Sequence, residues 1–187
     1  MHWTCRTITD LPRDALEQVY LHLSPSRKEH IDRLRLEADK TRSLAAQWLL
    51  QQLLEETRGI DAVLHRSANG QPYLTGCDLY VSLSHCENMV ACAVSEEPVG
   101  IDIERIRPVK AGLCRRVCTP EELAYLQADP DQLNEDPAAL GRFFEIWTGK
   151  EAYFKKCGTG ITNLRAVNVL SLSRQVHTID DYVLQII

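Results

Sequence analysis

Two acidic residues, Asp102 and Glu104, lie one residue apart in a segment that alternates between apolar and polar side chains, residues 99–104. On a strand, both point to the same face, about 6.6 Å apart along the chain. Two carboxylates at this spacing repel each other, and a hard divalent cation such as Mg²⁺ would relieve the repulsion. Polar alternation on an edge strand is the simpler explanation, although the flanking Ile101 and Ile103 indicate a buried opposite face and an ordered strand. The pair therefore indicates a metal site or the solvent face of an edge strand.

A second candidate lies in the apolar-rich segment 143–155. If this segment is a helix, Trp147, Glu151 and Lys155 follow at i, i+4 and i+8 and share a stripe. An ordinary Glu–Lys pair beside a core tryptophan is the simpler interpretation. Because the neighbours are apolar, we expect Glu151 and Lys155 at the margin of a buried surface, where ions usually need partners. A carboxylate and a cation beside a metal would suit phosphate chemistry.

A third, weaker candidate is the segment Ser82-Leu83-Ser84-His85. Hydroxyl and imidazole groups at the end of a strand can donate hydrogen bonds to a phosphate. A single histidine in a turn is more often structural. Alone, the segment does not identify a site.

In the first half of the chain, the elements that position these residues begin at Ser24-Pro25, which is typical of a helix start. Apolar residues at helical spacing predict one long helix from there to about Leu49. Turn residues follow at 69–72, and the apolar pattern then predicts strands at 79–84, 89–94 and 99–104, the first two joined by residues 85–88 as a hairpin.

The second half follows a similar plan. Thr119-Pro120-Glu121-Glu122 has the pattern of a capping box that opens a short helix. A long helix is predicted over residues 138–157, followed by strands over 167–170 and 182–187. We therefore predict an α+β fold with two similar halves, residues 1–98 and 99–187, each a long helix packed on a small antiparallel sheet.

Composition excludes several classes of protein. The net charge of −5 gives no uniform basic field for nucleic acid, and the arginine-rich first helix lacks interleaved aromatic residues. Seven cysteines, an odd number without a C-x-x-C pair, favour a reducing compartment. No apolar run is long enough to span a bilayer, and the first ten residues lack the apolar core of a signal peptide. We expect a cytoplasmic protein that binds neither nucleic acid nor membranes.

Taken together, these motifs resemble the phosphopantetheinyl transferase superfamily, and its surfactin-synthetase-activating type more closely than the short holo-acyl-carrier-protein synthase type. The segments occur in the family's order over nearly the whole chain, and the last two are jointly specific. They are residues 24–44, Asn69-Gly70-Gln71-Pro72, Ser82-Leu83-Ser84-His85, Val99 to Glu104, and Trp147-Thr148-Gly149-Lys150-Glu151-Ala152-Tyr153-Phe154-Lys155.

The resemblance implies two α+β halves in a pseudo-twofold arrangement with coenzyme A in the cleft between them. Residues 1–98 would provide nucleotide contacts, and residues 99–187 the metal and catalytic residues. Asp102, Glu104 and Glu151 would bind Mg²⁺. A chain with both halves need not trimerise as the short type does, so a monomer is expected.

The resemblance also implies the reaction. The enzyme would transfer the 4′-phosphopantetheine moiety of coenzyme A to a serine of an apo acyl or peptidyl carrier protein, releasing adenosine 3′,5′-bisphosphate. Lys155 would neutralise the pyrophosphate. Glu151, directly or through a water that it orients, would take the proton from the serine. Glu122 matches a family glutamate near that serine, but the capping-box interpretation of Glu122 is equally open.

Further coenzyme A contacts follow from the same motifs. Those predicted on the 3′-phosphate and adenine side are Arg27, Arg42, Ser84 and His85, and Gln71 and Lys150 complete the predicted set. Gln71 stands where the family has lysine, so one phosphate contact is weaker or comes from another cation. The alternative function is a coenzyme A- or carrier-binding module without catalysis. The retained carboxylates, Asp102, Glu104 and Glu151, count against it.

Overall fold

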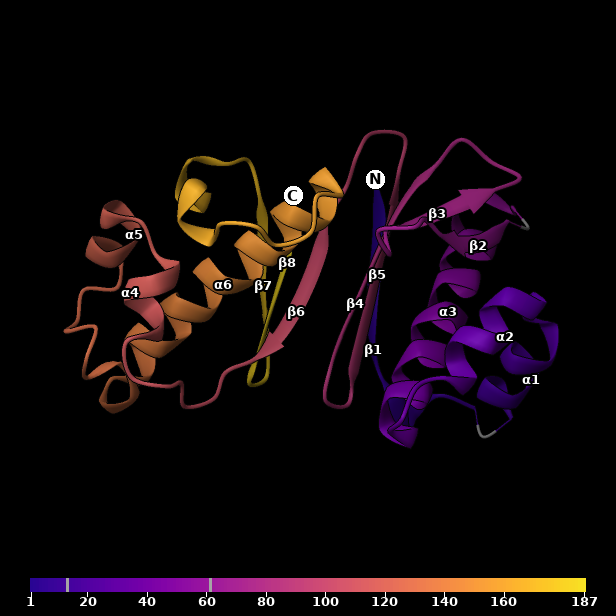
Figure 1. The fold of residues 1–187 in the computed structure, drawn as a ribbon, viewed down its shortest axis with the longest axis horizontal. Coiled ribbons are helices and arrows are strands. Elements are labelled where there is room, and N and C mark those ends of the chain that lie inside the picture. Colours follow the sequence, from indigo (N-terminus) through magenta and orange to yellow (C-terminus); the bar gives the residue numbers. More distant parts are fainter. Residues whose placement is uncertain (13, 61) are drawn as a thin grey trace. The chain divides into compact units, whose positions relative to one another are not determined.

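Two structural units divide the chain, Met1–Val99 and Gly100–Ile187, in a computed structural model that describes residues 1–12, 14–60 and 62–187. Each unit combines helices with small antiparallel sheets, so the predicted α+β class is confirmed (Figure 1). The pseudo-twofold arrangement and the division of roles between the halves stay predictions. No helix among the described residues is long and apolar enough to cross a membrane.

Unit 1 contains a three-stranded antiparallel sheet in the order β1-β5-β4 and a separate two-stranded sheet, β2-β3. Helix α3 packs against the larger sheet, and its buried leucines form one core with residues of β4 and β5. The elements are β1 (His2–Thr7), η1 (Ile8–Asp10), α1 (Ala15–His22), α2 (Pro25–Asp32), α3 (Glu37–Arg58), β2 (Val63–Arg66), β3 (Pro72–Thr75), β4 (Tyr80–Cys86) and β5 (Met89–Ser95).

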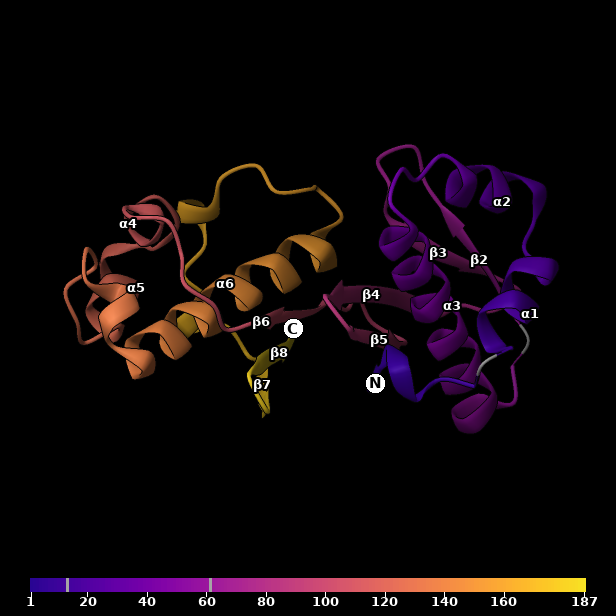
Figure 2. The ribbon, with the colours of Figure 1, turned by 90° about the horizontal axis from the view of Figure 1, so that it is seen from below.

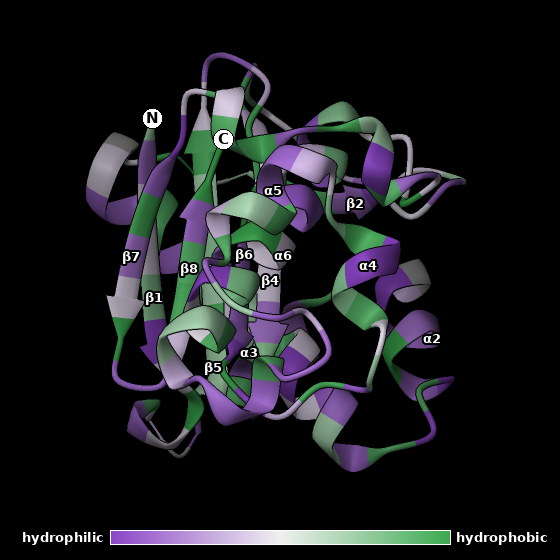
Figure 3. Cartoon of the chain, turned by 90° about the vertical axis from the view of Figure 1, so that its left-hand side faces the viewer, coloured by the Kyte–Doolittle hydropathy of each residue, from purple (hydrophilic) through white to green (hydrophobic). Residues whose placement is uncertain are grey.

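The prediction of one long first helix is wrong, because the chain breaks between α2 and α3. Ser24 and Pro25 do begin a helix, as predicted, but Leu36 is extended, with φ −100° and ψ 130°, and caps α3. The apolar residues taken as one stripe serve two clusters: Ile31 packs with residues of α1, whereas Leu49 packs on the sheet. In Figure 3, α2 is predominantly hydrophilic.

The predicted hairpin is confirmed, with a tighter turn. Strands β4 and β5 pair antiparallel, and His85 and Cys86 pair with β5 instead of forming the connection. The turn itself is Glu87-Asn88, with Glu87 at φ 50°. A two-residue turn with positive φ matches the twist of the flanking strands, which explains the longer ladder.

Unit 2 contains a three-stranded antiparallel sheet in the order β6-β8-β7, with α6 packed against β6 and β8 (Figure 2). The predicted strand at 167–170 is wrong, because two 3-10 turns occupy this region and carry Asn caps at Asn163 and Asn168. The elements are β6 (Ile101–Arg105), α4 (Leu113–Val117), α5 (Pro120–Tyr125), η2 (Leu133–Glu135), α6 (Pro137–Cys157), η3 (Leu164–Ala166), η4 (Val169–Ser171), β7 (Gln175–Ile179) and β8 (Tyr182–Ile186).

Local sequence explains the limits of α6, which were predicted to within one residue. The Asp136 carboxylate accepts hydrogen bonds from the backbone N–H groups of Ala138 and Ala139, and Pro137 occupies the first helical position. At the other end Gly158 adopts a left-handed conformation, φ 65°, which ends the helix.

Candidate active site

Strand β6 and helix α6 bring Asp102 and Lys155 together, 53 positions apart in the chain. The ammonium Nζ of Lys155 donates to Asp102 Oδ1 at 2.7 Å, and Asp102 is only 4% exposed. Asp102 lies on β6, which pairs with the central strand β8 and packs against α6. An ion pair at the margin of a helix–sheet core keeps its charges close and partly shielded from water. The sequence predicted both residues for one site, and the structure places them in contact.

Glu104 is paired with a cation that the sequence analysis missed. Arg107 Nη1 donates to Glu104 Oε2 at 2.9 Å and to the carbonyl oxygen of Arg105. The Arg107 guanidinium also lies 5.7 Å from the centre of the Phe144 ring, a cation–π contact with α6. The only signal in the sequence was its i+3 position after Glu104, which is uninformative just beyond a strand.

Glu151 is electrostatically coupled to the other two acids. Burial, the negative charge of Asp102 and, to a smaller extent, that of Glu104 together raise the pKa of Glu151 to about 7. Lys155 opposes these effects. A carboxyl group whose pKa is near neutrality can accept and release a proton at physiological pH. The three predicted acids are therefore neighbours in one charged cluster.

This donor set has the chemistry of a site for a hard divalent cation, with carboxylates from two elements and a shielded location. As the side chains stand, no group of three or more His, Cys, Asp or Glu within the described ranges could hold a metal ion. Cations hold two of the carboxylates, Lys155 that of Asp102 and Arg107 that of Glu104. Binding a metal ion here would require these ion pairs to loosen.

Glu122 and Lys150 form an ion pair that is fully buried, 0% exposed on both sides, with Nζ 2.8 Å from Oε2. The capping box with Thr119 is present, so that interpretation of Glu122 is confirmed. Glu122 also accepts from the backbone N–H of Val169 at 2.9 Å. Lys150 donates to two further carbonyl oxygens, those of Leu164 and Val167. These contacts favour a structural role for both side chains, and their predicted catalytic and coenzyme A roles stay predictions.

Arg27 is a buried cation in unit 1, 5% exposed, held by Ser43 Oγ at 2.7 Å and Gln47 Oε1 at 3.2 Å. Its Nη1 is buried and has no hydrogen-bond partner among the described residues. Burial, and then repulsion from Arg66, lower the pKa of Arg27 to about 10. Arg27 lines a pocket of about 400 Å³ between α3 and β2. A buried cation with an unused donor is suited to hold an anion.

Two basic residues beside Arg27 were missed in the sequence. Arg66, at the end of β2, donates from Nη1 to the carbonyl oxygen of Gly70 at 2.8 Å, directly beside Gln71. Partial burial and the charges of Arg27 and Arg66 lower the pKa of His30. Arg66 thus places a cation at the turn where Gln71 replaces the family's lysine. No local pattern in the sequence indicates that the two chain segments meet.

The remaining predicted contacts are spread over unit 1. Arg42 on α3 pairs with Asp39 at 2.5 Å and reaches the carbonyl oxygen of Glu87 in the β4–β5 turn, two residues after His85. In β4, Ser84 is buried and His85 is exposed. Arg42 and His85 therefore lie near one end of the same hairpin.

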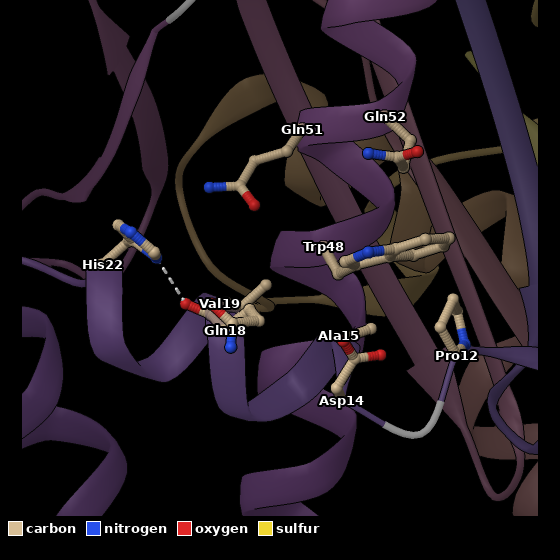
Figure 4. Close-up of a pocket in the computed structure, with 9 residues that line it drawn as sticks. All are labelled: Pro12, Asp14, Ala15, Gln18, Val19, His22, Trp48, Gln51 and Gln52. Atoms are coloured by element: carbon tan, nitrogen blue, oxygen red, sulfur yellow. Dashed lines mark hydrogen bonds between the residues drawn. The ribbon is translucent and has the colours of Figure 1, made fainter.

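Another pocket of unit 1, about 360 Å³, lies between α1 and α3 (Figure 4). Trp48 forms one wall, and the glutamine side chains of Gln18, Gln51 and Gln52 lie around it. None of the residues described as lining it belongs to the predicted site. The pocket is therefore not part of the candidate active site.

Comparison with known proteins finds similar sequences over much of the chain. Residues 98–184 match the model of the 4′-phosphopantetheinyl transferase superfamily. The 4′-phosphopantetheinyl transferase of Bacillus subtilis is 28% identical over 145 residues, covering 75% of this chain and 62% of that protein. The psf-1 transferase of Bacillus pumilus is 29% identical over 154 residues, covering 80% and 64%. HetI of a Nostoc species is 28% identical over 170 residues, covering 86% and 70%.

The chain spans less than two thirds of the length of the two Bacillus proteins, 62% and 64%. Strand β6 and helix α6, which carry the clustered acids and Lys155, lie within the segment that the family model matches. Residues 98–184 are thus similar to the 4′-phosphopantetheinyl transferase superfamily, and the relatives that match most of the chain are transferases of that name.

Proposed function

We propose that this protein transfers the 4′-phosphopantetheine moiety of coenzyme A to a serine of an apo acyl or peptidyl carrier protein. The observation that carries the proposal is the electrostatic coupling of Glu151 with Asp102, Glu104 and Lys155, on two elements within the segment that the family model matches. A protein that only bound coenzyme A would gain nothing from crowding three acids, whose mutual repulsion costs stability.

In this proposal Asp102, Glu104 and Glu151 would hold Mg²⁺, which would supply positive charge to neutralise the pyrophosphate. Lys155 would move from Asp102 to the pyrophosphate, where its positive charge would neutralise the reacting phosphoryl group. Arg107 leaves Glu104 in the same way and stays close through its contact with the Phe144 ring. The chain thus exchanges internal ion pairs for contacts with the metal and the substrate.

Glu151 is the proposed base. Directly or through a water that it orients, its carboxylate would take the proton of the carrier serine, since a serine hydroxyl is a weak nucleophile until a base removes its proton. The serine oxygen bonds to the β-phosphorus of coenzyme A while the bond from that phosphorus to the bridging oxygen breaks. Adenosine 3′,5′-bisphosphate leaves, and the proton stays on Glu151.

Unit 1 supplies the proposed contacts to the 3′-phosphate and adenine side. Arg27 has an unused donor, and Arg66 adds a cation beside Gln71. Arg42, Ser84 and His85 complete the set, as the resemblance implies. We propose a cytoplasmic monomer that binds neither nucleic acid nor membranes, and the seven free thiols support the reducing compartment.

The test is transfer itself. The protein is incubated with coenzyme A, Mg²⁺ and several apo carrier proteins, and intact mass spectrometry detects the added arm. Asp102→Ala and Glu151→Gln should each abolish turnover while the fold is retained, and Glu135→Gln, at an exposed glutamate, serves as the matched control. Normal rates in Asp102→Ala would remove the metal assignment.

The alternative is a module that binds coenzyme A or a carrier protein without catalysis. It predicts saturable binding of coenzyme A by calorimetry and no mass increase on any carrier at any Mg²⁺ concentration. That pair of results would overturn the proposed function and support the alternative.

A further inference from the structure

Gln185 is an amide buried in the middle of a sheet. It lies on β8, the central strand of unit 2, and is 0% exposed. The strand register places Gln185 directly opposite Asp102 on β6. Directly paired residues point to the same face of an antiparallel sheet, so Gln185 and Asp102 both face α6. A polar amide buried beside a predicted metal ligand requires a structural explanation.

The hydrogen bonds of Gln185 fix the orientation of its amide. Arg174 Nη1 donates to Gln185 Oε1 at 3.1 Å, so the oxygen must be the end that faces Arg174. The Nε2 group therefore points to α6, where it donates to the carbonyl oxygen of Glu145. Arg174 thus orients an amide that ties β8 to the backbone of α6.

Gly149 makes room for this contact. A Cβ atom on Gly149 would lie 2.9 Å from Gln185 Oε1 and 3.3 Å from the Cβ of Val169, both closer than ordinary contacts. The helix therefore approaches the sheet more closely than it could with alanine at this position. Gly149 and Gln185 thus fit together at the contact between helix and sheet.

A second close approach lies further along α6. A Cβ atom on Gly100, just before β6, would lie 1.8 Å from the carbonyl oxygen of Ala152. Positions 145, 149 and 152 are spaced i, i+4 and i+7, so the helix rests on the sheet along one row. Glu151 follows Gly149 by two residues and directly precedes Ala152. The position of Glu151 relative to Asp102 is therefore set by these two contacts.

We infer that Gln185 is a positioning residue, and that its fit against Gly149 sets the distance between α6 and β6 on which the acid cluster depends. This inference rests on the proposed function. Gln185 does not touch the reacting atoms. It holds α6 so that Glu151 and Asp102 can bind one cation.

The first test replaces Gln185 with methionine, which is similar in length and makes none of the hydrogen bonds. Gln175→Met, at an exposed glutamine of the neighbouring strand β7, is the matched control. Calorimetric titration with Mg²⁺ should give an affinity at least tenfold weaker for Gln185→Met, as expected when a supporting residue of a metal site is lost. The control should match the parent protein. A variant that is less stable to urea but binds Mg²⁺ with the parent's affinity would overturn the inference, because a merely structural residue behaves in this way.

The second test is a double-mutant cycle in metal-free buffer. Gly149→Ala should destabilise the protein, because the new methyl group meets Gln185 Oε1. In the Gln185→Ala background the same change should cost clearly less, because the shorter side chain leaves space. If the two changes alter the free energy of unfolding additively, Gly149 and Gln185 are not coupled, and the inferred fit between them is wrong.

The two tests also separate this inference from the proposed function. If the parent protein neither binds Mg²⁺ nor transfers the arm, the proposed function fails, while the urea cycle still decides whether Gly149 and Gln185 are coupled. If the parent does both and Gln185→Met is unchanged, only the positioning role fails.

Discussion

At the scale of single residues, the acid cluster is held by cations of the chain itself. Lys155 neutralises Asp102 and Arg107 neutralises Glu104, while Glu151 is left with a raised pKa. The carboxylates of Asp102 and Glu104, which would bind a divalent ion, thus already form ion pairs within the protein. This makes the cluster sensitive to pH and to metal ions in predictable directions.

The pKa of Glu151 predicts how stability depends on pH in buffer without divalent ions. The pKa is about 7 in the folded protein and 4.5 for an ordinary glutamate, so the folded state binds more protons between these values. The contribution of Glu151 to the free energy of unfolding should be fully present below pH 4.5 and should be lost as the pH rises through 7. The loss should be about 1–2 kcal/mol for a partly exposed group. Urea unfolding across this range measures the slope.

Glu151→Gln should remove this slope, since the amide does not titrate. Added Mg²⁺ should act in the opposite direction, because a metal needs the deprotonated carboxylate and its stabilising effect grows with pH. A slope that persists in Glu151→Gln would mean that another group is responsible.

The buried pair Glu122–Lys150 gives a second prediction. Lys150→Met would leave Glu122 buried without its cation, which should lower the free energy of unfolding by about 3 kcal/mol or more. Changing both residues, Lys150→Met with Glu122→Leu, should cost less than Lys150→Met alone, because no buried charge remains. Urea unfolding measures each value. Lys110→Met, at an exposed lysine, is the control and should change little.

The same variant distinguishes a structural role of Lys150 from a role in binding coenzyme A. If Lys150→Met is as stable as the parent protein and loses only affinity for coenzyme A, Lys150 is a substrate contact and not a structural residue.

At the scale of elements, periodicity and capping signals predicted α6 and the β4–β5 hairpin well, because both are encoded locally. The break between α2 and α3 was missed, since Ile31 and Leu49 fit one helical stripe although they pack on different partners. The prediction of a strand at 167–170 is wrong, because a short apolar run does not distinguish a strand from the 3-10 turns that occur there. In both segments, tertiary contacts and not the local sequence determine the secondary structure.

The candidate site shows the same limit. Spacing on one strand and one helix made the acids and Lys155 candidates, and the resemblance implied that they share one site. Arg107, Arg66 and Gln185 could not, because their roles come from contacts between segments far apart in the sequence or from a turn without a pattern.

The close approach of β6 to α6 leads to a prediction about two glycines. Gly100→Ala would place a methyl group 1.8 Å from the Ala152 carbonyl oxygen, so the helix or the strand must move. We expect a loss of about 3 kcal/mol or more in unfolding free energy and weaker Mg²⁺ binding. Gly141, inside α6 with open space around it, is the control: Gly141→Ala should stabilise the protein by about 0.5–1 kcal/mol. Equal effects of the two changes in urea unfolding would contradict the packing argument.

At the scale of the whole molecule, the proposed coenzyme A contacts come from both units. Arg27 and Arg42 belong to unit 1, whereas Lys155 and the acids belong to unit 2. A ligand that binds the folded protein stabilises every part that it contacts. Binding should therefore be visible in both units at once.

Hydrogen–deuterium exchange can test this expectation. With coenzyme A and Mg²⁺, amides of α2 and the start of α3 should be protected together with those of β6 and α6, which belong to unit 2. Asp102→Ala should weaken protection in unit 2 and keep part of that around Arg27, because the 3′-phosphate contacts do not need the metal. Protection confined to unit 2 in the parent protein would contradict the assignment of Arg27, Arg42 and His85 to the substrate, even if the transfer reaction itself is observed.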